Sequence, residues 1–115
     1  MKKVHKYSVG EVAIQWLTVP KGAELLTIEL QGGFPFLWVL VDDAQTVFVK
    51  CEIVIYKTGE KIREYWTREQ YLGTLIVAND TKVYHFFGEV FNDTEIEPPA
   101  DLVVIEADIA ESNNV

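Results

Sequence analysis

The stretch FPFLWVLV, residues 34–41, constrains this chain more than any other part of its sequence. In an extended strand, successive side chains point to opposite faces, and here both sets of side chains are apolar. Such a pattern is typical of a strand that is covered on both faces. Two glycines precede the stretch and two aspartates follow it, which favours a bounded strand over a helix. We therefore expect a central strand in a β-rich domain.

Turn-forming residues divide much of the remaining chain into alternating apolar segments of strand length. At most a short helix is expected near residues 64–70, where Thr67 is a candidate N-cap. The predicted fold class is mainly β, either a compact antiparallel sheet or a small sandwich or barrel-like domain of about six or seven strands. The other expected strands are residues 4–9, 13–19, 25–31, 46–56, 71–77 and 82–87.

Charge is unevenly distributed along the chain. The sequence has 10 basic and 18 acidic residues, and its net charge is -8. Seven acidic residues and no bases follow position 91, which leaves eleven acids against ten bases in residues 1–91. We therefore expect a β domain over residues 1–91 and an acidic linker and tail over residues 92–115. Within the tail, the apolar segment 101–109 is a candidate added strand or short helix.

The balance of charges also limits the partners and the location that we expect. A protein that binds duplex nucleic acid needs a basic surplus, which this domain lacks. No apolar segment is long enough to cross a membrane, and no signal peptide is visible. Cys51 is the only cysteine and lies in an alternating apolar segment, so a buried free thiol is predicted. The expected location is the cytoplasm, without a membrane partner.

Sequence motifs of catalysis are absent. The chain contains no G-x-S-x-G, H-E-x-x-H, P-loop or G-x-G-x-x-G pattern. His85 lies among aromatic residues and is interpreted as a hydrogen-bonded structural histidine, with a ligand or base as the alternative. Asp42 and Asp43 are interpreted as turn residues, because no third carboxylate follows at the spacing of a metal-binding loop. We predict no enzyme activity, no catalytic residue, no metal site and no cofactor.

Residues 56–71 form the candidate binding site, with four of the ten bases, four aromatic residues and a Thr-Gly turn. Aromatic rings stack on nucleobases, Lys and Arg bind phosphates, and a glycine turn brings backbone N–H groups close to an anion. The alternative is a solvated connector in which the rings cover the edge of the core and Glu60, Glu64 and Glu69 pair with the bases. The predicted ligand-binding residues are Lys57, Thr58, Gly59, Lys61, Arg63, Tyr65, Trp66 and Arg68.

Three segments carry a resemblance to a known family: PKGAELLTIELQGGFPFLWVLVD at 20–42, IYKTGEKI at 55–62 and YLGTLIVANDTKVYHFFGEV at 71–90. In these segments the chain resembles a family of small, mostly uncharacterised domains of bacteriophages and prophages. The middle segment of that family usually reads Y-G-T-G-H, whereas this chain has Tyr-Lys-Thr-Gly-Glu at 56–60. The resemblance implies a viral source and no particular activity.

Several small phage proteins of comparable size are sponges, oligomeric and non-enzymatic binders of the cyclic nucleotides of host defence systems. By that similarity we expect a phage protein that evades host immunity by sequestering a small anionic nucleotide signal in the cytoplasm of the host bacterium. A homo-oligomer is expected, because so small a β domain with an apolar tail has surface to bury between chains. The alternative is an interaction module that inhibits a host protein through an exposed strand edge or the acidic tail.

Overall fold

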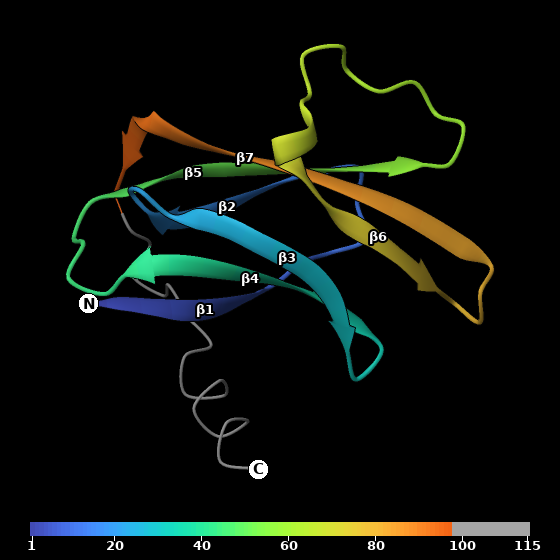
Figure 1. Cartoon of the computed structure of the whole chain (residues 1–115), viewed down its shortest axis with the longest axis horizontal. Helices are drawn as coiled ribbons and strands as arrows, with labels where there is room; N and C mark the ends of the chain where they lie inside the picture. The colour runs from blue at the N-terminus through green and yellow to red at the C-terminus, as the bar shows by residue number, and fades with distance from the viewer. Residues whose placement is uncertain (98–115) are drawn as a thin grey trace.

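Two antiparallel sheets make up the computed structural model of the chain, which describes residues 1–97 apart from the side chain of Glu69 (Figure 1). The first sheet has the order β1-β4-β3 and contains β1 (Lys2–Ser8), β3 (Glu24–Gln31) and β4 (Phe34–Asp42). The second has the order β2-β5-β7-β6 and contains β2 (Ile14–Pro20), β5 (Phe48–Lys57), β6 (Tyr71–Val77) and β7 (Lys82–Ile96). A single 3₁₀ turn, η1 (Arg68–Gln70), is the one helical element within residues 1–97. The predicted mainly β fold with a short helical turn near residues 64–70 is confirmed.

The central position of residues 34–41 is also confirmed, because β4 pairs with β1 on one side and with β3 on the other. Its inner face is fully buried, with Leu37 and Val39 at 0% exposure. Its outer face, which carries Phe36, Trp38 and Leu40, is half-buried. The strand that is covered on both faces is β5, in which residues 51–56 are all buried. Its outer face is covered by the connection that follows it in the chain.

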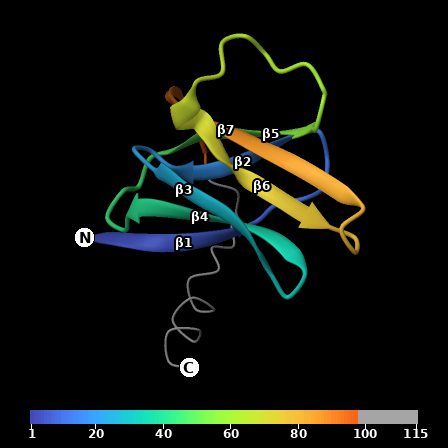
Figure 2. The same ribbon diagram turned by 45° about the vertical axis from the view of Figure 1, so that its right-hand side comes forward.

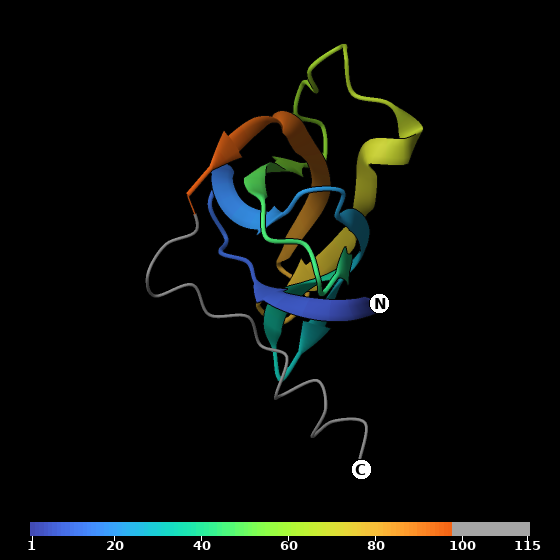
Figure 3. The same ribbon diagram turned by 90° about the vertical axis from the view of Figure 1, so that its left-hand side faces the viewer.

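The core lies between the two sheets, where the inner faces of β4, β5 and β7 meet. Phe86 and Ile53, both at 0% exposure, are the largest fully buried side chains of the second sheet in this core. Gly88 permits the close packing of three side chains, because a Cβ there would lie within 2.9 Å of Leu25, Ile53 and Leu72. The strands wrap around this core when the molecule is seen from its side (Figure 3).

The two sheets approach each other along β3 and β6, which lie side by side (Figure 2). Gly73 lies at this contact with a φ of +149°, and a Cβ there would be 3.0 Å from Ile28. A side chain at this position would meet both a steric clash and a backbone conformation that L residues rarely adopt. Glycine therefore allows the edges of the two sheets to pack closely, as in a barrel-like sandwich.

The predicted boundary at residue 91 is wrong for the end of β7, which continues to Ile96 and pairs there with Phe48. Backbone pairing does not require apolar side chains, so an exposed polar end of a strand lacks the alternation that reveals it in the sequence. This end is held by Lys21, whose Nζ donates to Glu95 Oε2 at 2.8 Å. The rest of the predicted tail, including residues 101–109, lies outside the described residues.

Removal of the Phe86 side chain should destabilise the protein strongly. Phe86→Ala leaves a cavity between the sheets and should lower the free energy of unfolding by about 3 to 5 kcal/mol. Phe34→Ala is the matched control, because Phe34 is 68% exposed and its loss should change stability by less than about 0.5 kcal/mol. Urea denaturation measures both, and equal losses in the two variants would contradict this core.

The buried hydroxyl of Tyr7 makes stability depend on alkaline pH. Burial raises the pKa of Tyr7 to about 12, and the hydroxyl has no hydrogen-bond partner among residues 1–97. The unfolded phenol ionises near pH 10 while the folded one stays protonated, so stability should fall as the pH rises from 10 towards 12. The free energy of unfolding of Tyr7→Phe should equal or exceed that of the parent at pH 7. Between pH 7 and 10.5 it should fall by about 1 kcal/mol less than that of the parent. Urea denaturation at both pH values tests this, and a loss at pH 7 would contradict it.

Candidate functional site

The connection between β5 and β6 contains most of the predicted ligand-binding residues, and the structure separates them into groups. This connection projects from the second sheet on the side away from β1 and β4 (Figure 1, Figure 3). Arg63, Tyr65 and Trp66 lie together on the outer face of the second sheet, whereas Lys57 and Thr58 line a cavity elsewhere. Gly59 and Lys61 are exposed, and the guanidinium of Arg68 lies 5.3 Å from the centre of the Tyr71 ring. The predicted residues therefore do not converge on one receptor.

Arg63 makes a bidentate ion pair with Glu52 of β5. Its Nη1 donates to Glu52 Oε1 at 2.9 Å and its Nη2 to Glu52 Oε2 at 3.2 Å. Glu52 is only 6% exposed, so its carboxylate needs a cation to offset the loss of water. The hydrogen bonds to Glu52 raise the pKa of Arg63 above its ordinary value. Arg63 is thus engaged in holding the connection on the sheet.

Trp66 covers the outer face of β5 and β7 in the same way. Its indole Nε1 donates to the hydroxyl of Tyr56 at 2.7 Å, and its ring lies 5.6 Å from that of Phe87 at an interplanar angle of 36°. Tyr65 lies against Trp66 with a ring separation of 5.5 Å, and it is 60% exposed. These contacts correspond to the alternative in which the rings cover the edge of the core. The paired carboxylate belongs to β5, however, and not to a glutamate of the connection.

His85 is a hydrogen-bonded structural histidine, as predicted. Thr58 Oγ1 lies 2.8 Å from its Nε2, and Thr74 Oγ1 lies 2.8 Å from its Nδ1. Both ring nitrogens are therefore occupied by threonine hydroxyls, one from the turn after β5 and one from the middle of β6. The hydroxyl of Thr58, one of the predicted ligand-binding residues, serves this contact.

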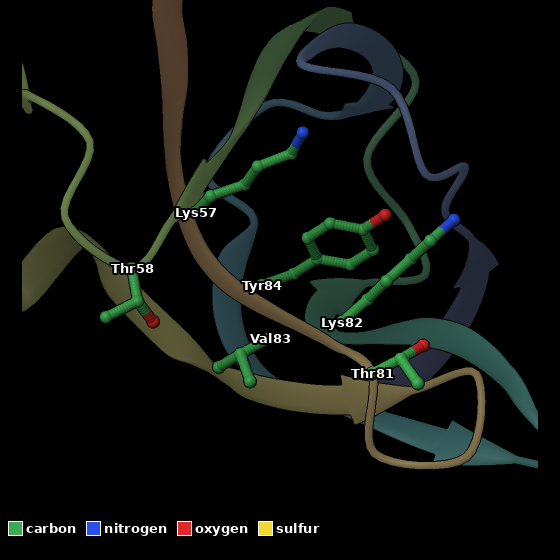
Figure 4. A pocket seen from close by; sticks show the side chains of 6 residues that line it. All are labelled: Lys57, Thr58, Thr81, Lys82, Val83 and Tyr84. Carbon is green, nitrogen blue, oxygen red and sulfur yellow. The ribbon is translucent and has the colours of Figure 1, made fainter.

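A cavity of about 400 Å³ lies where the end of β5 meets the start of β7 (Figure 4). We call it the basic cavity, because its lining contains two lysines and no carboxylate. The ammonium groups of Lys57 and Lys82 extend to the same side as the hydroxyl of Tyr84 (Figure 4). The lining residues are Lys57, Thr58, Thr81, Lys82, Val83 and Tyr84.

The groups of this cavity are available to a ligand. Within residues 1–97, neither Lys57 nor Lys82 forms an ion pair, and the Tyr84 hydroxyl makes no hydrogen bond. Tyr84 as a residue is only 8% exposed, and its hydroxyl, which makes no hydrogen bond within residues 1–97, is available to a ligand in the cavity. Two ammonium groups and a phenol near one another form a site that is suited to an oxyanion.

The turn before Lys82 forms one rim of the basic cavity. Ala78, Asn79 and Asp80 take φ values of 54°, 56° and 66°, in the left-handed region. Asn and Asp tolerate this region, whereas for Ala it is strained. Thr81 closes the turn, because its Oγ1 donates to the carbonyl of Ala78 at 2.6 Å. The strained backbone therefore lies directly before Thr81 and Lys82, which line the cavity.

Thr81, Lys82 and Tyr84 were not predicted as site residues, although a signal for them exists in the sequence. The hairpin of residues 71–77 and 82–87 was predicted correctly, and Lys82 and Tyr84 share one face of its second strand. Their contact with Lys57 depends on the pairing of β5 with β7, in which Lys57 lies opposite Tyr84. That register joins residues 27 positions apart and cannot be read from local patterns.

A second cavity, of about 310 Å³, shares two wall residues with the basic cavity. The shared residues are Lys57 and Tyr84, and two glutamates line the remainder together with apolar side chains. We call it the glutamate cavity, and its other lining residues are Glu11, Val12, Ala13, Ile55 and Glu60. No group of three metal-ligating side chains occurs within the described part of the chain. Residues 1–97 also contain no helix with the length and apolar character that crossing a bilayer requires.

The model of the family described as a domain of unknown function (DUF7352) matches residues 1–103. The chain belongs to this family. The DUF7352 match covers all seven strands within residues 1–97 and the lining of both cavities. No curated protein and no solved structure matches the chain.

The ion pair between Arg63 and Glu52 should contribute to stability. Arg63→Ala leaves a carboxylate that is 8% exposed without its cation, and should lower the free energy of unfolding by about 2 kcal/mol. Arg68→Ala is the matched control, because it removes the same charge from an exposed position and should cost less than about 0.5 kcal/mol. Urea denaturation measures the stability of both variants. An unchanged stability of Arg63→Ala would contradict a stabilising role of its ion pair with Glu52.

Proposed function

We propose that this protein binds a small anionic ligand of the nucleotide class in the basic cavity and holds it without chemical turnover. The observation that carries the proposal is that two lysines and the hydroxyl of Tyr84, none of them paired within residues 1–97, line one cavity without a carboxylate. Each charge-assisted hydrogen bond to an oxyanion is worth about 1.5 to 3 kcal/mol. A volume of about 400 Å³ also lies in the range of sites for small molecules.

The chemistry of the lining supports binding rather than turnover. Hydrolysis of a nucleotide needs a base, a nucleophile or a metal near the scissile bond. His85, which contacts Thr58 beside the cavity, has both ring nitrogens bonded to threonine hydroxyls. The remaining polar groups of the lining are ammonium, phenol and hydroxyl groups, which suit the recognition of a phosphate.

The resemblance to phage domains supports the biological setting that we propose. All six residues of the basic cavity lie in two of the three resembling segments, 55–62 and 71–90. In this setting the protein sequesters a nucleotide signal of host immunity in the cytoplasm of an infected bacterium. Self-association belongs to the same proposal, because a sponge gains capacity and avidity from several copies.

The edge strand β2 supports the alternative function, inhibition of a host protein through an exposed edge. Ile14 and Trp16 of this strand are 51% and 54% exposed, and β2 has a neighbour, β5, on one side only. Exposed apolar side chains on an edge strand are typical of a surface that adds a partner strand. Substitution of Trp16 by Ser should abolish such an interaction and leave nucleotide binding intact.

Calorimetry against inorganic phosphate, nucleoside monophosphates and cyclic di- and trinucleotides tests the proposed function. At least one nucleotide should bind, and the double variant Lys57→Gln, Lys82→Gln should weaken its affinity at least about tenfold, which corresponds to 1.4 kcal/mol. Chromatography after incubation should recover the nucleotide unchanged.

Lys61→Gln is the matched control for this experiment, since it removes the same charge from an exposed position outside the basic cavity. It should leave the affinity within about twofold of the parent, because an exposed charge is screened by solvent. Flat titrations with every compound, or an equal loss in Lys61→Gln, would refute the proposed function.

A further inference from the structure

The glutamate cavity adds a second kind of chemistry to the basic cavity. The two cavities share Lys57 and Tyr84, so a ligand that lies against this wall has access to both. On one side the wall continues with Lys82 and two threonines, and on the other with Glu11 and Glu60. A ligand that fits both must carry an anionic group at one end and hydrogen-bond donors at the other.

Tyr84 connects the two cavities, because its side chain lines both of them. The residue is more than nine-tenths buried, and its hydroxyl makes no hydrogen bond within residues 1–97. A phenol hydroxyl both donates and accepts a hydrogen bond. A ligand that spans the wall can therefore use this hydroxyl in either cavity.

Glu11 lies in the loop between β1 and β2, and hydrogen bonds hold this loop in place. The loop is closed by Gln15, whose side chain accepts from Gly10 N and donates to Gly10 O, both at 2.8 Å. It is fixed to β5 by the bond from Ile55 N to the carbonyl of Ala13 at 2.9 Å. Within residues 1–97, the carboxylate of Glu11 forms no hydrogen bond or ion pair.

Glu60 is already used in a tight turn and has a different role. Its Oε1 accepts from the backbone N–H of Lys57 at 2.8 Å, and its own N–H donates to the carbonyl of Lys57 at 3.0 Å. This reciprocal pair fixes the main chain of Lys57 at the shared wall. Glu11 therefore remains as the free acceptor of the glutamate cavity.

We propose that the two cavities together bind a guanine nucleotide, with its phosphate at Lys57 and Lys82 and its base at Glu11. This inference rests on the proposed function. A carboxylate is an acceptor only, and guanine offers it two neighbouring donors, N1–H and N2–H. Adenine and cytosine place a ring-nitrogen acceptor beside their amino group, and uracil places a carbonyl on each side of its N–H. Each of these bases therefore meets the carboxylate with a repulsive lone pair.

The apolar part of the glutamate cavity is suited to the plane of a base. Val12, Ala13 and Ile55 line it next to Glu11, so the ring lies on aliphatic surface while its edge faces the carboxylate.

Titration of the full chain with GMP, AMP and inorganic phosphate tests the inference. GMP should bind at least about tenfold more tightly than AMP, because a mismatched donor and acceptor pattern leaves buried polar groups unpaired. In Glu11→Gln the ratio of the two affinities should fall at least fivefold, whereas the affinity for inorganic phosphate should stay within twofold of the parent. Glu64→Gln is the matched control, because Glu64 is exposed and lies outside both cavities.

The outcomes separate this inference from the proposed function. Equal affinities for GMP and AMP, both lost in the Lys57→Gln, Lys82→Gln variant, would overturn guanine recognition and leave the anion site in place. A guanine preference that persists in Glu11→Gln would overturn the role of Glu11. The absence of binding by all three compounds would overturn guanine recognition, and flat titrations with the cyclic di- and trinucleotides as well would overturn the proposed function. The thermal melting of Glu11→Gln should equal that of the parent, since Glu11 is exposed and makes no contact that its loss would break.

Discussion

Two polar groups on the outer face of β5, the carboxylate of Glu52 and the hydroxyl of Tyr56, determine how the second half of the domain is arranged. Both are buried, at 6% exposure each, and buried polar groups must be hydrogen-bonded. Arg63 and Trp66 satisfy them and hold the connection from β5 to β6 on the sheet. Arg63 is engaged in this way, whereas Lys57 at the end of β5 and Lys82 at the start of β7 form no ion pair within residues 1–97.

The alternation of apolar side chains was sufficient to predict most of the strands. It identified residues 34–41 as the central strand of a sheet and predicted the hairpin of β6 and β7. The prediction failed where the pattern of apolar side chains does not follow the strand pairing or the burial of a face. Residues 92–95 are polar and exposed yet continue β7, and the apolar outer face of β4 is half-buried, whereas β5 is the strand covered on both faces. The burial of a strand face depends on which other segment of the chain packs over it. That packing is determined by contacts between residues distant in sequence.

The dependence on contacts distant in sequence also explains why only some residues of the candidate site were predicted. Lys57 and Thr58 were identified from the composition of residues 56–71, and both line the basic cavity. Proximity in sequence was taken as proximity in space, which grouped them with Arg63, Tyr65 and Trp66 on another face of the molecule. The actual neighbours of Lys57 are Lys82 and Tyr84, which the antiparallel pairing of β5 with β7 brings opposite it. In an antiparallel sheet, residues directly opposite each other on paired strands are close enough to interact, however far apart they are in sequence.

We propose that the contacts on the outer face of β5 stabilise the fold, whereas the end of β5 and the start of β7 bind the ligand. Two-dimensional NMR of the ¹⁵N-labelled full chain, titrated with GMP, tests this proposal, because it reports on both surfaces in one experiment. We expect shifts of the backbone amides of residues 57–58 and 81–84, with the indole N–H of Trp66 unchanged, since that proton is donated to Tyr56. Shifts confined to the Trp66 indole and residues 63–68 would contradict it.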